Sequence, residues 1–264
     1  MIPPPPSGRQ VDLAAFGQHL TVVEVGGGIR AYGTDAGPVI DGYGPGEMCS
    51  GGRGQILAPW PNRLADGRFE WDGRQLQTAL TEVEAGNAIH GLVRWSAWAV
   101  RGVEADRVEM AYRLHPQPGW PWTLDLAVEY RLGPAGLAVR TEVTNCSDQS
   151  CPIGFGWHPY LYAFGGLVDD TVLTVPAGTA YRSDERGLPT GRFPVAGTEV
   201  DFGVGRPVGP ARLDVCFTDL ERAADGEAVV GLADPHGGGS ARLWVDQAYS
   251  HLMVFSGDTL ADPA

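Results

Sequence analysis

Apolar and polar residues alternate along several short segments of the chain. In residues 123–132 every second position is apolar, and the apolar residues are Leu124, Leu126, Val128, Tyr130 and Leu132. Residues 108–114 and 137–144 show the same alternation. Because successive side chains of a strand point to opposite faces, this pattern predicts β-strands with one buried face and one solvated face.

Short connecting sequences predict how these strands pair. The sequence GPAG at 133–136 joins 123–132 to 137–144 and predicts a β-hairpin. The sequence QAYS at 247–250 predicts a second hairpin, formed by 241–246 and 251–255. No segment has a convincing helical pattern, since Gly226 and Gly231 interrupt the best candidate.

These patterns together predict an all-β fold, a largely antiparallel sandwich or barrel. The content of 38 glycines and 21 prolines among 264 residues suits many short strands joined by tight turns. No linker, change of composition or internal repeat divides the chain. We therefore expect a single domain over residues 1–264, with residues 1–8 as a loose terminus.

Charge and cysteine content narrow the class of function. The formal net charge is −13, which argues against nucleic acid as a partner, and all 19 basic residues are arginines, which excludes lysine Schiff-base chemistry. The four cysteines have neither zinc-site nor redox spacing. No apolar signal core or membrane-spanning run is found. We expect a soluble cytoplasmic protein, monomeric or homodimeric, that binds no membrane.

Five polar residues stand out because they lie within apolar or turn-rich sequence. They are Asn62 and Arg63 in PWPNRLADG, His90 in NAIHGLVRW, His158 in GFGWHPYL and Asp214 in RLDVCFTDL. Taken singly, each is more often a packed histidine, a cap or a turn residue than a functional group. Their combination is more informative because tryptophan and tyrosine residues accompany them, namely Trp60, Trp95, Trp157 and Tyr160. Flat aromatic faces with a few directed polar groups suit a sugar ring.

Other kinds of site find less support. The histidines show no HxH or HExxH spacing, so we predict no metal site. The GxSxG motif of a serine nucleophile is missing as well. An apolar cleft with one acid also disfavours the paired carboxylates of a glycosidase.

With these motifs assembled, the chain resembles the aldose 1-epimerase (mutarotase) family. The matching segments are PWPNRLADGRFEWDG, IHGLVRWSAW, WHPYL and DVCFTDL, which occur in the family's order. The tryptophan before Pro-Asn-Arg and the ending LMVFSGDTL are similar to a bacterial subgroup. The resemblance implies a large antiparallel β-sandwich with an open sugar-binding cleft and no cofactor.

The resemblance also implies a reaction, the interconversion of the α and β anomers of a free hexose. Opening the ring requires a proton at the ring oxygen and loss of a proton from the anomeric hydroxyl, so an acid and a base act together. By the family's pattern, His158 is the general acid and His90 supports the same proton transfer. Arg63 and Asp214 bind sugar hydroxyls, and Asn62 orients Arg63.

The general base of the family has no counterpart in this sequence. It is a glutamate that follows the segment matching LMVFSGDTL, and the sequence ends at Ala264 before such a residue. Asp258 matches a different family position, and Met253 stands where many members have a glutamine. Truncation is the favoured explanation. A natural variant that binds sugars without turnover, or a different carboxylate acting as base, are the alternatives.

Two further functions remain open at this stage. One is a non-catalytic sugar-binding or sensing protein of the same fold. The other is a phosphosugar epimerase, which requires several arginines to converge on a phosphate. The candidates for that role are Arg53, Arg63, Arg68 and Arg94.

Overall fold

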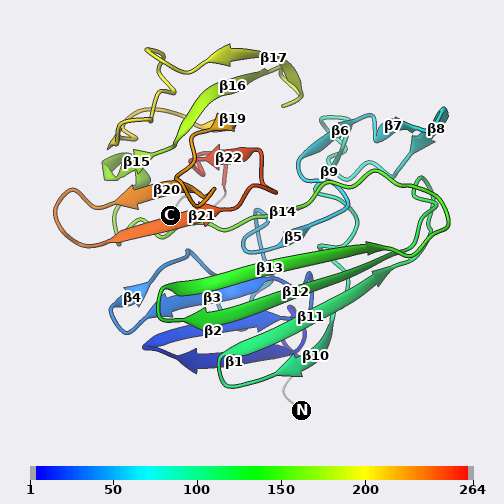
Figure 1. Ribbon diagram of the computed structural model, residues 1–264, viewed down its shortest axis with the longest axis horizontal. Coiled ribbons are helices and arrows are strands. Elements are labelled where there is room, and N and C mark those ends of the chain that lie inside the picture. Colours follow the sequence, from blue (N-terminus) through cyan, green and yellow to red (C-terminus); the bar gives the residue numbers. More distant parts are fainter. Residues whose placement is uncertain (1–3, 261–264) are drawn as a thin grey trace. The chain divides into compact units, whose positions relative to one another are not determined.

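The structure, a computed structural model, describes residues 4–260, and nearly all of their regular secondary structure is β-strand (Figure 1). Within them the only helical segment is the short 3-10 helix η1 (Val168–Asp170), and no helix is long and apolar enough to cross a membrane. The prediction of an all-β fold is confirmed. The chain divides into two compact units between Tyr160 and Leu161.

The first unit contains two antiparallel four-stranded sheets. One sheet has the order β1 (Gln10–Ala15), β2 (Gln18–Val23), β3 (Ile29–Thr34) and β4 (Gly37–Pro38). The other has the order β10 (Ala99–Val103), β11 (Arg107–Leu114), β12 (Leu124–Gly133) and β13 (Gly136–Asn145). Both sheets contribute side chains to one core, including Val22, Ile29, Met110 and Val128. The unit is therefore a β-sandwich.

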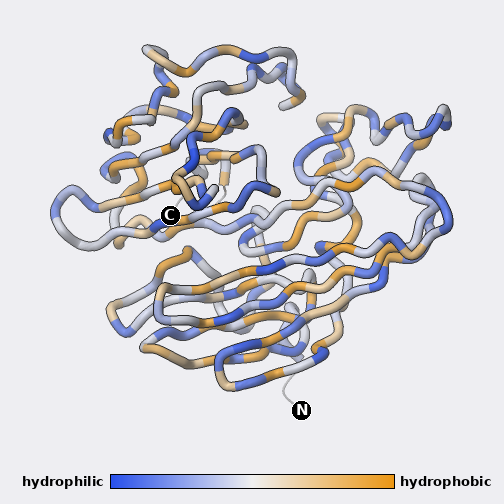
Figure 2. Tube along the Cα trace, viewed as in Figure 1, coloured by the Kyte–Doolittle hydropathy of each residue, from blue (hydrophilic) through white to orange (hydrophobic). Residues whose placement is uncertain are grey.

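The alternation in the sequence accounts for the inner and outer faces of these strands. Along β12 buried residues alternate with more exposed ones, as Figure 2 shows by the interleaved hydrophobic and hydrophilic colours. The predicted hairpin is confirmed, because β12 pairs with β13 up to the Gly133–Gly136 pair beside the turn. On β13 the charged residues Arg140 and Glu142 are exposed to solvent.

Three shorter ladders in the first unit carry the loops with the candidate residues. Strand β5 (Ile56–Leu57) pairs with β14 (Gly156–Trp157), and β6 (Arg63–Ala65) pairs with β9 (Asn87–Ile89). The third ladder is the hairpin of β7 (Arg68–Trp71) and β8 (Arg74–Gln77). All three are antiparallel.

The second unit also consists of two antiparallel sheets around its own core. The first sheet has the order β18 (Arg206–Pro207), β15 (Val172–Thr174), β20 (Ala228–Ala233) and β21 (Ser240–Val245). The second has the order β17 (Pro189–Pro194), β16 (Ala177–Ser183), β19 (Asp214–Leu220) and β22 (Leu252–Phe255). Leu173, Ala180, Phe217 and Leu232 lie in the core between them.

The predicted hairpin of residues 241–246 and 251–255 is wrong. Strand β21 pairs with β20, and β22 pairs with β19 of the other sheet. The guanidinium of Arg222 donates hydrogen bonds to the carbonyl oxygens of Val245, Asp246 and Tyr249 at 3.2, 2.9 and 2.6 Å. These bonds hold the connection in a bend that leads the chain from one sheet to the other.

The beginning of the chain is more ordered than its composition indicates. Residues 1–3 lie outside the described residues, but Ser7 is buried and its carbonyl oxygen accepts the Val25 N–H at 3.0 Å. Gly8 N–H also donates to Pro5 O at 2.9 Å. Ser7 and Gly8 are therefore anchored to the rest of the unit, whereas the expectations of a loose terminus over residues 1–8 and of a single domain stay predictions.

Candidate active site

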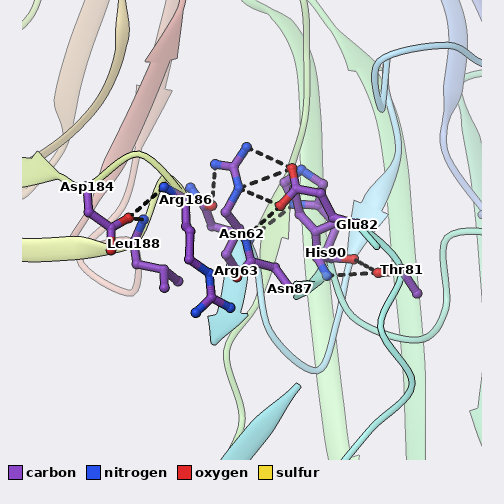
Figure 3. A network of polar contacts seen from close by, with 10 residues as sticks. Asn62, Arg63, Thr81, Glu82, Asn87, His90, Asp184, Arg186 and Leu188 are labelled. Atoms are coloured by element: carbon purple, nitrogen blue, oxygen red, sulfur yellow. Dashed lines mark hydrogen bonds and ion pairs between the residues drawn. The ribbon is translucent and has the colours of Figure 1, made fainter. Parts of the chain in front are cut away.

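His90 and Asn62 form a reciprocal pair at the end of the β6–β9 ladder. Asn62 precedes β6 and His90 follows β9, and both have left-handed backbone conformations with φ of +59° and +63°. The His90 N–H donates to Asn62 O at 2.9 Å, and the Asn62 N–H donates to His90 Nδ1 at 3.1 Å (Figure 3). Left-handed conformations are costly for residues other than glycine, and these two bonds compensate for that cost.

The bond from Asn62 determines the state of the His90 ring. Because Nδ1 accepts a hydrogen bond, the proton of the neutral imidazole lies on Nε2. Burial, together with the charges of His158, Arg94 and Arg63, lowers the pKa of His90 to about 3. His90 is therefore a neutral hydrogen-bond donor through Nε2 at physiological pH.

Gly91 explains why a glycine follows His90 in the sequence. Its φ is +73°, and a Cβ atom at this position would lie 2.0 Å from the carbonyl oxygen of Ala58. The same carbonyl oxygen accepts the Leu92 N–H at 2.7 Å. Any side chain at residue 91 would separate these backbones and displace the adjacent His90.

Arg63 is held by a carboxylate that the sequence did not single out. Its Nε and Nη2 atoms donate to the two carboxylate oxygens of Glu82 at 2.9 and 3.1 Å, and Nη1 donates to Asn62 Oδ1 at 3.3 Å (Figure 3). The fully buried Asn87 donates to Glu82 at 2.8 Å. Burial alone raises the pKa of Glu82, but the hydrogen bonds from Arg63 and Asn87 outweigh it and leave this pKa lowered.

His158 is positioned by backbone bonds to the loop before β5. Its N–H donates to Gln55 O at 3.1 Å, and its carbonyl oxygen accepts the Gly54 N–H at 2.8 Å. The imidazole stacks on Tyr160 with ring centroids 5.2 Å apart, and meets the ring of His90 edge-on at 5.3 Å. The structure therefore brings together the two predicted catalytic histidines, together with Asn62 and Arg63.

The surroundings of the two rings favour protonation of His158 over His90. Burial lowers the pKa of His158, and the charges of Arg94 and Arg53 lower it further, whereas its own backbone carbonyl raises it. At 5.3 Å one imidazolium opposes the protonation of the other. His90 faces an N–H donor and His158 faces a carbonyl, so a single shared proton belongs on His158.

A second arginine supports the His158 ring through Tyr160. Arg53 is buried, and its Nε donates to Asp41 at 2.8 Å. Its guanidinium lies over the Tyr160 ring at 4.7 Å, and the Tyr160 hydroxyl donates to Gly51 O at 2.9 Å. From the sequence, Arg53 was a candidate only for binding a phosphate, and its pairing with Asp41 was not predicted.

The aromatic residues near these motifs have different environments. Trp60 is 9% exposed and lies in the core beside Trp120, so the expectation that it contributes a sugar-binding face is wrong. Trp157 is half-buried and donates its indole N–H to Gly54 O at 3.2 Å. Trp95 is 53% exposed and is the member of this group with the most accessible ring.

Asp214, the remaining predicted substrate ligand, begins β19 in the second unit. Its backbone pairs with Phe255 of β22, and the residue is exposed. Its role toward sugar stays a prediction. In residues 4–260 no group of three or more His, Cys, Asp and Glu side chains is arranged to hold a metal ion.

The loops of the first unit thus bring together two imidazoles, one a neutral hydrogen-bond donor and the other more readily protonated. The protein belongs to the aldose 1-epimerase family, whose sequence model matches residues 9–263. The uncharacterized protein YihR of Escherichia coli K12 is 31% identical over 96% of this chain and 81% of that protein. Human galactose mutarotase is 30% identical over 56% of this chain, a stretch that covers 44% of the human protein.

Solved structures confirm the fold. A galactose mutarotase-like protein from Clostridium acetobutylicum superposes with a TM-score of 0.84 at 19% identity, over 95% of this chain and 82% of that chain. Galactose 1-epimerase from Lactobacillus acidophilus NCFM gives a TM-score of 0.71 at 18% identity, over 94% and 90% of the two chains. The prediction of the family from the sequence motifs is confirmed.

The tautomer of His90 can be tested directly by NMR. In a ¹⁵N–¹H correlation spectrum of the imidazoles we expect His90 to remain neutral, with the proton on Nε2, between about pH 5 and pH 8. The reason is its pKa of about 3 and its bond from the Asn62 N–H. A titration step of His90 within this range, or a proton on Nδ1, would contradict the assignment.

The same pKa predicts that the protein is less stable in mild acid. In the unfolded chain His90 binds a proton near pH 6.5, but in the folded protein it does so only near pH 3. As the pH falls through this window the unfolded state binds more protons than the folded state, so the free energy of unfolding decreases. The expected contribution is up to about 1.4 kcal/mol per pH unit, measured by urea unfolding, and the variant His90→Asn should lack it.

Proposed function

We propose that the protein is an aldose 1-epimerase that interconverts the α and β anomers of a hexose with a free anomeric hydroxyl. The proposal is carried by the arrangement of the two histidines, whose rings are 5.3 Å apart and of which His158 accepts a proton more readily than His90. An acid that carries the proton and a neutral donor beside it suit the protonation of a ring oxygen. Membership of the family supports the same reaction class.

Each residue then has a role in the opening of the ring. The imidazolium of His158 donates its proton to the ring oxygen as the bond between that oxygen and C1 breaks. The Nε2–H of His90 donates a hydrogen bond to the sugar beside the same oxygen. A base removes the proton of the anomeric hydroxyl, so that an aldehyde forms. Rotation about the C1–C2 bond and reversal of both transfers give the other anomer.

Substrate binding is assigned to Arg63, Asn62 and Asp214. The guanidinium of Arg63 is fixed by Glu82 and by the side chain of Asn62, so its orientation is set before a sugar arrives. Prior ordering of this kind lowers the entropy cost of binding. The proton-accepting base is assigned to no residue of the chain.

Polarimetry on fresh α-glucose and α-galactose, and NMR exchange spectroscopy on other aldohexoses, test the proposal. The experiment compares the 264-residue chain with the product of the complete reading frame that contains it. We expect at least one of these proteins to accelerate mutarotation well above the buffer rate. If neither accelerates any aldohexose while calorimetry still shows saturable sugar binding, the protein is a sugar-binding protein and the proposed reaction is wrong.

A further inference from the structure

Strand β13 (Gly136–Asn145) forms one edge of its four-stranded sheet (Figure 1). Strand β12 pairs with one side of it along all ten of its residues. In residues 4–260 no strand pairs with the other side. A long edge strand with an open side is a template for pairing with a further strand.

The first hydrogen bond beyond the ladder shows which backbone groups of β13 point to the open side. The Cys146 N–H donates to Thr123 O at 2.9 Å, on the β12 side of the strand. Because the N–H and C=O groups of successive residues point to opposite sides of a strand, the even-numbered residues bond to β12 and the odd-numbered residues face the open side. The open groups thus include those of Val139, Thr141 and Val143. For these three residues the described part of the chain records no backbone bond on that side.

The inner face of β13 leaves apolar surface and a hydroxyl unsatisfied along this edge. Leu137, Val139 and Val143 pack against the core of the first unit but are only partly buried. The Thr141 hydroxyl is buried and has no hydrogen-bond partner within residues 4–260. A strand added at this edge would cover the remaining apolar surface, and a threonine opposite Thr141 is a suitable partner for its hydroxyl.

The charges on the outer face of β13 are complementary to themselves. The Arg140 and Glu142 side chains are 78% and 68% exposed, and their mutual contact of 3.9 Å is too exposed to hold them firmly. If a second copy pairs antiparallel with Thr141 opposite Thr141, Arg140 of each copy faces Glu142 of the other. Val139 of each copy then faces Val143, which is a favourable pair of β-branched residues.

The neighbouring registers are disfavoured by the same charges. A shift by one step in either direction centres the pairing on Arg140 or on Glu142, and each of these registers sets two identical charges opposite each other. Like charges directly opposite destabilise a strand pair, whereas opposite charges stabilise it. Only the pairing centred on Thr141 satisfies both charges, so the sequence of β13 specifies one register.

We propose that two copies of the protein associate through their β13 strands, which pair antiparallel about Thr141 and join the two sheets into one continuous sheet. The opposed pairs Val139–Val143, Thr141–Thr141 and Val143–Val139 each exchange two backbone hydrogen bonds. Such an interface is the same on both copies and closes at a dimer. One strand from each copy buries a small area, so the dimer is weak and dependent on concentration. The inference is independent of the proposed reaction.

Charge reversal tests the register. Sedimentation velocity over a range of concentrations is measured for the 264-residue chain and for the product of the complete reading frame. Arg140→Glu and Glu142→Arg should each raise the dissociation constant about 10- to 100-fold, because each variant sets like charges opposite at both ends of the pairing. An equimolar mixture of the two variants should recover the association, because every charge then faces its opposite. The matched control is Glu109→Arg on β11, two strands from the edge, which should change nothing.

Amide hydrogen exchange measured by NMR tests the backbone pairing. The N–H groups of Val139, Thr141 and Val143 should exchange quickly in dilute protein and more slowly as the concentration rises. The N–H of Arg140 bonds to β12 and should be protected at every concentration. Thr141→Pro removes an N–H that faces the open side without removing a bond to β12, so it should weaken the dimer.

The possible outcomes decide between the second copy and other occupants of the edge. A protein that stays monomeric up to its solubility limit overturns the inference, as does a dimer that neither charge reversal weakens. A monomeric reading-frame product beside a dimeric 264-residue chain also overturns it, because a segment of the same polypeptide then covers β13. None of these results bears on the epimerase function, which mutarotation measures separately.

Discussion

Replacement of His158 by asparagine is expected to reduce kcat/KM for mutarotation by about 10²- to 10⁴-fold. Asparagine retains a polar side chain of similar reach but cannot carry the proton that the ring oxygen requires. The backbone bonds of His158 to Gln55 and Gly54 involve only main-chain atoms and should persist in the variant. The loss should therefore appear in kcat, measured by polarimetry, with little change in the thermal unfolding temperature.

The pH dependence gives a second signature of the same role. The pKa of His158 is lowered from its ordinary 6.5, mainly by burial. The acid form is consequently lost as the pH rises through that lowered value, and kcat/KM should decline on the alkaline side of it. His158→Asn should abolish this decline, whereas His115→Asn, at an exposed position after β11, should keep both the rate and the profile. An unchanged kcat in His158→Asn would show that the proton comes from another group.

Local patterns were sufficient to predict elements that are specified by neighbouring residues. Alternation in residues 123–132 and 137–144 predicts both faces of β12 and β13, because strand geometry alone relates position to face. The error at 247–250 arose because strand pairing depends on a residue distant in sequence. Arg222 bends this connection through three carbonyl oxygens, and no local signal reports such a contact.

In the candidate site, too, features set by local sequence were predictable and contacts between residues distant in sequence were not. The motifs located His90, His158, Asn62 and Arg63, because these residue types are unusual in their local sequence. The bond from the Asn62 N–H to His90 Nδ1 was not predictable, since it depends on two left-handed residues that face each other across the β6–β9 ladder. Glu82 was missed because an acidic residue in a polar loop resembles an ordinary surface charge until its partner is known.

Gly54→Ala is expected to destabilise the protein by about 3–5 kcal/mol or to prevent folding. The φ of Gly54 is +68°, and an added Cβ would lie 1.9 Å from the carbonyl oxygen of Ile29. The backbone of Gly54 also donates to His158 O at 2.8 Å, and its carbonyl oxygen accepts the Trp157 indole N–H at 3.2 Å. Relief of the clash would therefore require movement of β3 or of the segment that carries His158. Urea unfolding and polarimetry of the folded fraction measure the two effects.

Gly73→Ala is the matched control for this substitution. Gly73 lies in the turn between β7 and β8 with a φ of +71°, and a Cβ there would have no atom within 4 Å. The Gly73→Ala variant should therefore lose about 1–2 kcal/mol in free energy of unfolding, because alanine is strained in a left-handed conformation, but it should have no steric clash. The difference between the two variants isolates the close approach of Gly54 to Ile29. If both variants lost the same stability, backbone strain alone would explain the loss in Gly54→Ala. The close approach of Gly54 to Ile29 would then not be what positions the adjacent His158.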